Sequence, residues 1–117
     1  MARPANPELP ARILEAAEQV VKAKGHEALA MRDLAARVGV TATAIYHYFR
    51  GKDELLLRLK LRAVELLNER IRGLDPRLGP MDRLHQLGRQ YLSFAEEHPN
   101  FYRLVFEAPI GRTSLAA

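Results

Sequence analysis

The sequence has no cysteine, which excludes disulfide bonds and thiolate chemistry. It has no apolar run near the roughly 20 residues of a membrane span, and Met1 leads into no signal-peptide core. Its two serines, Ser93 and Ser114, lie outside any strand-turn-helix context that would expose a nucleophile. The four histidines are too scattered for a metal site, and no glycine-rich phosphate loop occurs. These absences make an enzyme a poor hypothesis, and we expect no cofactor, no metal and no membrane partner.

The most informative stretch runs from Met31 to Phe49 and has the pattern of two short helices joined at Gly39. Each predicted helix has an apolar stripe at helical spacing: Leu34, Ala35 and Val38 on the first, and Ile45, Tyr48 and Phe49 on the second. Gly39 ends the first helix, because glycine adopts a positive φ without strain, and the small Ala35 lets the backbones approach. The pattern predicts a helix-turn-helix, whose second helix enters the major groove of DNA, or alternatively a helical hairpin with this spacing by chance.

The face that this stripe leaves exposed on the second helix favours DNA binding. Four side chains share it, and none is acidic: Ala42, Thr43, Tyr46 and His47. Small, hydroxyl and imidazole side chains suit contacts with phosphates and base edges. The net charge of +4 agrees, because residues 1–62 hold 11 basic and seven acidic side chains, whereas residues 63–117 hold seven of each. A solvated basic face would look similar.

These residues resemble the TetR family of bacterial transcriptional regulators over about the first half of the chain. The resemblance rests on three strings, Gly39-Val40-Thr41, Ile45-Tyr46-His47-Tyr48-Phe49 and Gly51-Lys52-Asp53-Glu54-Leu55-Leu56. It implies an all-α fold with a three-helix DNA-binding head that contains the helix-turn-helix, a long connector helix, and the start of a helical ligand-binding and dimerisation domain.

The resemblance also implies a function. We expect a sequence-specific transcriptional regulator in the bacterial cytoplasm, associated with the nucleoid. It would be a repressor that binds a palindromic double-stranded DNA operator as a homodimer and is released by a small-molecule effector. The alternative is a helical protein-interaction module that kept the fold but lost operator binding.

The DNA-binding residues implied by the resemblance are Arg32, Thr41, Ala42, Thr43, Tyr46, His47 and Lys52. Tyr46 matches a family tyrosine whose hydroxyl meets a backbone phosphate, and Lys52 opens a helix whose first amides favour an anion. The sequence departs from the family at two places. Met31 and Ala44 stand where family members usually have hydroxyl residues, which removes two phosphate contacts and a cap from the first motif helix. Thr41 is the expected cap of the second.

The chain divides into a mobile N-terminal arm (1–9), a DNA-binding domain (10–51), and a connector helix with a partial regulatory domain (52–117). We expect helices near residues 10–24, 32–38, 42–48, 52–72, 80–97 and 99–106, with no strand. Gly73 to Pro80 reads as the internal linker.

The stretch from Tyr91 to Leu104 resembles the start of one class of TetR ligand-binding domains. It contains the candidate ligand-pocket residues, which are Tyr91, Phe94, Phe101, Tyr102 and Phe106. Aromatic residues at helical spacing are also typical of a plain core. Family members are usually longer and dimerise through two later helices. We therefore expect the apolar faces of residues 84–106 to lack half their packing partners, either because the polypeptide is longer or because a shortened protein pairs through this surface.

Overall fold

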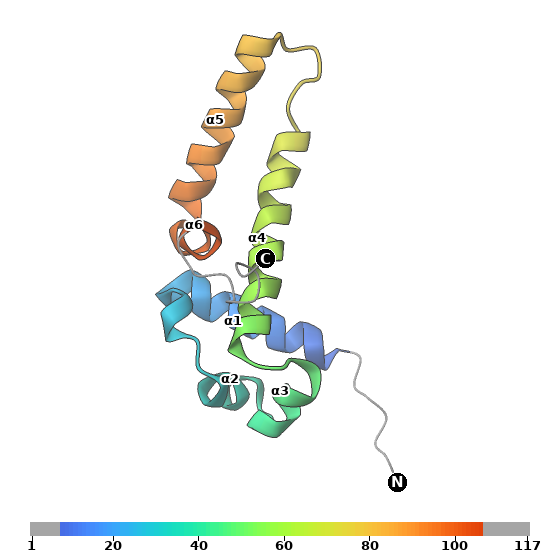
Figure 1. Cartoon of the computed structure of the whole chain (residues 1–117), viewed down its shortest axis with the longest axis vertical. Helices are drawn as coiled ribbons and strands as arrows, with labels where there is room; N and C mark the ends of the chain where they lie inside the picture. Colours follow the sequence, from blue (N-terminus) through green and yellow to red (C-terminus); the bar gives the residue numbers. More distant parts are fainter. Residues whose placement is uncertain (1–7, 107–117) are drawn as a thin grey trace, which may run out of the picture.

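The computed structural model describes residues 8–106, and within that range every regular element is helical. The elements are α1 (Leu9–Lys24), the 3₁₀ turn η1 (His26–Ala28), α2 (Met31–Val38), α3 (Ala42–Tyr48), α4 (Lys52–Arg72), α5 (Pro80–Glu97) and α6 (Pro99–Phe106). The all-α prediction is confirmed. The molecule measures 61 × 31 × 30 Å, with α1, α2 and α3 at one end and the antiparallel α4 and α5 extending from them (Figure 1).

Four of the predicted helices have the expected bounds, and two begin one residue earlier. Residues 1–7 of the predicted arm lie outside the described residues, and its predicted end is wrong, because Leu9 opens α1 and is buried in the core. Pro10 follows it in the first helical turn, where the missing N–H is not needed. The turn η1 was not predicted. No described helix is both long and apolar enough to cross a membrane.

The head is held together by the apolar stripes of its helices. Ile13, Ala17 and Val21 of α1 are fully buried and form one face of that helix. They share a core with Leu34 and Ile45 of the two motif helices. Burying an aliphatic side chain stabilises a fold by about 1.5–3 kcal/mol relative to leaving it exposed. The predicted stripes therefore fix how α2 and α3 sit on α1.

The turn between α2 and α3 has the predicted geometry. Gly39 has a φ of 85°, in the left-handed region, and its amide and that of Val40 both donate to the carbonyl of Ala35. The hydroxyl oxygen of Thr41 accepts a 3.1 Å hydrogen bond from the amide of Ala44, which confirms Thr41 as the cap of α3. The cap position of α2 holds Ala30, so no side chain caps that helix, as predicted.

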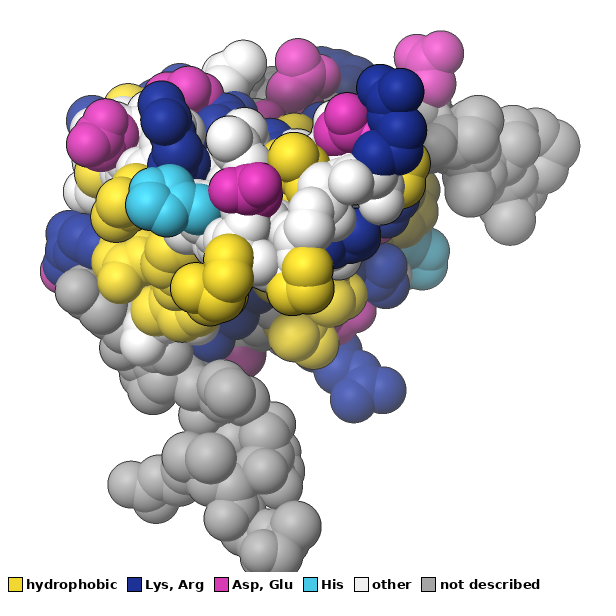
Figure 2. All heavy atoms as spheres, turned by 90° about the horizontal axis from the view of Figure 1, so that it is seen from above, with side chains coloured by type: hydrophobic (Ala, Val, Ile, Leu, Met, Phe, Trp, Pro, Cys, Tyr) yellow, Lys and Arg dark blue, Asp and Glu magenta, His cyan; other side chains and the backbone are white. Residues whose placement is uncertain are grey.

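The packing of α6 differs from the prediction. The short helix folds back against α1 and α4, so Phe94, Phe101 and Leu104 are completely buried rather than half-packed. The expected apolar exposure does occur at Leu84 and Phe106, whose side chains are at least half exposed, and Met81 and Leu92 are exposed as well. Figure 2, seen onto the end with the α4–α5 loop, shows hydrophobic side chains gathered along one side of the molecule.

Polar contacts join α6 to the head as well. The side-chain amide of Asn100 donates a 2.8 Å hydrogen bond to the carbonyl of Lys22, at the carboxyl end of α1. The ammonium of Lys22 lies 5.0 Å from the centre of the Phe101 ring. Arg103 and Glu27 of η1 form an ion pair with 3.6 Å between Nη2 and Oε1. The second half of the chain is thus anchored on the end of α1 and on η1.

His98, between α5 and α6, predicts a pH dependence of stability. Burial lowers the pKa of His98 from 6.5, and the nearby charges of Lys22 and Arg70 lower this pKa further, against weaker opposing effects of Glu97 and Glu18. The unfolded chain therefore binds this proton more readily than the folded one. The contribution of His98 to the free energy of unfolding should therefore be fully present above pH 6.5 and be lost as the pH falls below that value. Melting temperatures between pH 7.5 and pH 5.5 measure this loss.

The variant His98→Gln should flatten this profile, although it also loses ring contacts with Phe94 and Phe101. Replacing the exposed His85 of α5 by Gln is the matched control and should leave the profile as it is in the parent. The hydrogen bond from Arg70 lowers the pKa of Glu97, but that contribution is lost only as the pH falls below 4.5. An unchanged slope between pH 5.5 and 7.5 in His98→Gln would contradict the assignment.

Candidate nucleic-acid interface

The outer side of α3 forms an open concave surface. Its lining residues are Thr41, Thr43, Ala44, Tyr46 and His47. Ile45 points the opposite way and is fully buried in the head core, so the helix is anchored on one side and free on the other. Every lining side chain is small or carries a hydroxyl or an imidazole, and none is acidic. This arrangement suits contact with a polyanion that also presents hydrogen-bonding edges.

Four of the seven predicted DNA-binding residues meet on this surface: Thr41, Thr43, Tyr46 and His47. Ala42 is placed differently, because it is half-buried and packs against the core. Ala44 lines the surface in its place, at a position where the resemblance led us to expect a hydroxyl. The concavity therefore has one methyl group where a further hydrogen bond to phosphate would otherwise form.

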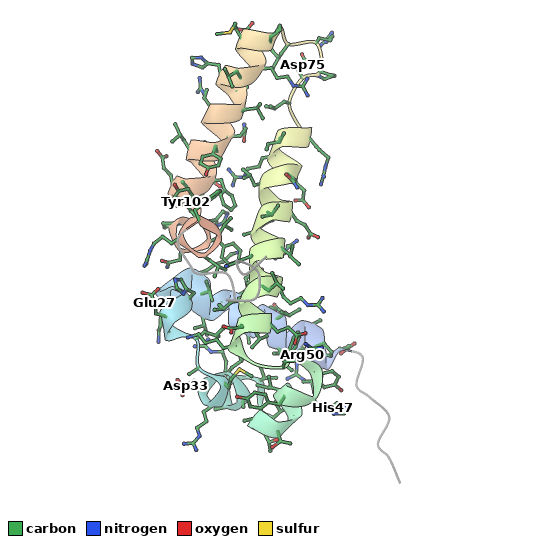
Figure 3. The ribbon with its side chains drawn as sticks, in the orientation of Figure 1. Glu27, Asp33, His47, Arg50, Asp75 and Tyr102 are labelled. Carbon is green, nitrogen blue, oxygen red and sulfur yellow. The ribbon has the colours of Figure 1, made fainter. Side chains whose placement is uncertain are left out.

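The two predicted cations lie on other elements. Arg32 is exposed at the second residue of α2, and Lys52 is the half-buried first residue of α4. Both belong to helices of the same end of the molecule as α3. Figure 3 shows His47 on α3, Arg50 in the loop between α3 and α4, and Asp33 on α2 at this end.

The loop from Arg50 to Lys52 is held in place by Glu54. The carboxylate of Glu54, in the first turn of α4, accepts a 2.7 Å hydrogen bond from the amide of Arg50. The ring of Tyr46 lies 3.9 Å from the point where a side chain on Gly51 would begin. Glu54 was named from the sequence only as part of the resemblance and was assigned no role, and the bond reaches the residue before the cap Gly51 rather than the cap itself.

The predicted pocket aromatics separate into two groups. Phe94 and Phe101 are fully buried core residues. The rings of Tyr91, Tyr102 and Phe106 pack on one another, with centres 5.0–6.0 Å apart, and Phe106 is half exposed. Burial raises the pKa of Tyr91, and Tyr102 adds to that effect. Within residues 8–106, no three side chains are grouped in a way that would hold a metal ion.

Comparison with known proteins gives consistent matches. A family described as "Bacterial regulatory proteins, tetR family" matches residues 13–59. The transcriptional activator FasR of Mycolicibacterium smegmatis is 32% identical over 97 residues, covering 82% of this chain and 44% of FasR. The transcriptional repressor DrrR1 of Streptomyces coeruleorubidus is 34% identical over 99 residues, covering 85% of this chain and 36% of DrrR1. The chain thus spans less than half the length of these curated relatives.

The fold also matches a solved structure. A TetR-like transcriptional regulator from Rhodococcus sp. RHA1 superposes with a TM-score of 0.63 at 25% identity, over 95% of this chain and 61% of that one. All of these proteins are described as regulators of transcription, a class that is not enzymatic.

Proposed function

We propose that this chain, whose residues 13–59 match the family described as "Bacterial regulatory proteins, tetR family", binds double-stranded DNA by placing α3 in the major groove. The observation that supports this most directly is the two-sided character of α3. Ile45 anchors it in the core, whereas Thr43, Tyr46 and His47 project from an open surface without an acidic group. A helix held in this way presents a fixed set of side chains to base edges.

We assign the contacts to two classes. Tyr46 and Lys52 bind backbone phosphates, because a tyrosine hydroxyl and an ammonium at a helix start both favour an anion. Thr41 lines the same surface as Tyr46 and serves the same class. Thr43, His47 and Arg32 read base edges, whereas Ala42 packs against the core and is left out of this class. Phosphate contacts give affinity for any sequence, whereas base contacts give discrimination.

Replacing Lys52 by Ala should weaken binding about equally on all duplexes. One fewer neutralised phosphate lowers the slope of log affinity against log salt by roughly one unit. The measurement is a salt titration on two probes: a duplex selected by the parent protein from a random pool, and a scrambled duplex of the same composition.

The matched variant is His47→Ala, whose side chain lies on the concave surface. This variant should lose roughly 1–3 kcal/mol of binding free energy on the selected duplex and little on the scrambled one. An unchanged salt slope in Lys52→Ala would exclude its phosphate contact. Absence of salt-dependent binding by the parent itself would instead favour an interaction module that has lost operator binding.

We further propose that the whole protein is a ligand-released repressor that acts as a homodimer on a palindromic operator. Two copies of α3 then contact two half-sites one helical turn apart. The division between head and regulatory part is drawn at residues 51 and 52, where α4 begins. The effector would contact Tyr91, Tyr102 and Phe106, whereas Phe94 and Phe101 are buried core residues. We place the protein in the cytoplasm, at the nucleoid.

A further inference from the structure

We infer that Arg12 of α1 is a positioning residue for DNA recognition. It holds the turn that leads into α3 and so fixes the orientation of that helix. The inference rests on the proposed function. The Nη2 atom of Arg12 donates a 3.0 Å hydrogen bond to the carbonyl of Val38, 26 residues further along the chain. Val38 is the last residue of α2, and three residues separate it from the start of α3.

The carbonyl of Val38 needs a partner from outside its own helix. The last four carbonyls of a helix have no partner within it. Here the amides of Gly39 and Val40 both return to Ala35, and the carbonyl of Val38 accepts its hydrogen bond from Arg12. The guanidinium also lies at the negative end of the α2 dipole, where a cation is favoured. The bond is thus both directed and charge-assisted.

The other end of Arg12 is equally well fixed. It precedes Ile13, which is fully buried against the motif helices, and the first turn of α1 is anchored by the buried Leu9. Arg12 therefore connects a rigid part of the head to the one segment whose geometry orients α3. A supporting bond of this kind keeps contact residues within the fraction of an ångström that base readout requires.

This position separates two possible roles of an arginine beside DNA. An arginine that contacts phosphate strengthens binding to every sequence. An arginine that orients the recognition helix acts mainly on discrimination, because base contacts need an accurate register, whereas phosphate contacts tolerate small rotations. The two roles predict different changes when the side chain is altered.

The test compares Arg12→Met with Arg58→Met in the full chain. Methionine keeps most of the aliphatic stem of Arg12 but removes the bond and the charge. Arg58 is exposed on α4 and supplies the matched loss of one charge. The probes are the duplex selected by the parent protein and its scrambled counterpart, each titrated over a range of salt concentrations.

For Arg12→Met we expect about a tenfold loss on the selected duplex, the size of a lost charge-assisted bond. On the scrambled duplex, the affinity of Arg12→Met should equal that of Arg58→Met. The slope of its log affinity against log salt should equal the slope of the parent. Hydrogen exchange of the Val40 amide should also accelerate about tenfold, while that of Val21 in α1 stays unchanged. A purely structural role would accelerate both amides and lower both affinities together.

Three results would overturn the inference. The first is an equal loss of affinity on both duplexes with a lower salt slope, which marks a phosphate contact. The second is an Arg12→Met variant that distinguishes the selected from the scrambled duplex as well as the parent does. The third is a general loss of folding. Failure of the parent to bind either duplex would refute the proposed function itself, and the inference with it. Loss of discrimination confined to Arg12→Met supports both.

Discussion

Replacing Phe101 by Ala should destabilise the protein by about 3–5 kcal/mol, the usual cost of removing a buried aromatic ring. Phe101 is completely buried where α6 meets α1 and α4, and its ring also lies under the ammonium of Lys22. A fold of this size has a total stability of about 5–15 kcal/mol, so the variant should lose a large fraction of it. Urea unfolding followed by circular dichroism measures the change.

Phe106→Ala is the matched control, since it alters the same residue type on the same helix. Phe106 is half exposed, and we expect its loss to cost less than about 1 kcal/mol. Similar costs for both variants would contradict the docking of α6 on the head. A smaller denaturant slope in Phe101→Ala would show that α6 detaches separately from the remaining core.

The helices were predictable because local chemistry fixes where each one ends. Gly25 and Gly39 both adopt positive φ after α1 and α2, as glycine does most easily. Pro80 and Pro99 open α5 and α6, where their missing amides cost nothing. Each of these signals lies within a few residues of the boundary that it sets. Periodicity then assigned the inward faces of α2 and α3.

Features that depend on long-range packing were not predictable from the same patterns. The pattern of residues 84–106 placed Phe94 and Phe101 on apolar helix faces. It did not predict that α6 folds back and that both side chains are buried. The bond between Arg12 and Val38 joins residues 26 positions apart, so no local spacing indicates it. Ala42 likewise lies on the predicted face of α3, yet the neighbouring core half covers it.

Neighbouring residues on α3 should divide stability from DNA binding. Ile45 is fully buried, and Ile45→Ala should cost about 2–5 kcal/mol of unfolding free energy. Tyr46 is 51% exposed on the opposite side. Tyr46→Phe keeps the ring beside Gly51 and removes only the hydroxyl, so its stability should stay within about 0.5 kcal/mol of the parent.

The two variants should differ just as clearly in DNA affinity. Loss of the Tyr46 hydroxyl should weaken binding roughly tenfold, because it removes a hydrogen bond to a charged phosphate, and the loss should be equal on selected and scrambled duplexes. Ile45→Ala removes no contact with DNA, so its loss of binding should follow from the loosened anchor of α3 and be larger on the selected duplex than on the scrambled one. Thermal unfolding and duplex titration on the same samples decide the matter. If Tyr46→Phe binds like the parent, the hydroxyl faces solvent in the complex, and Lys52 with the amides of its helix must hold that phosphate alone.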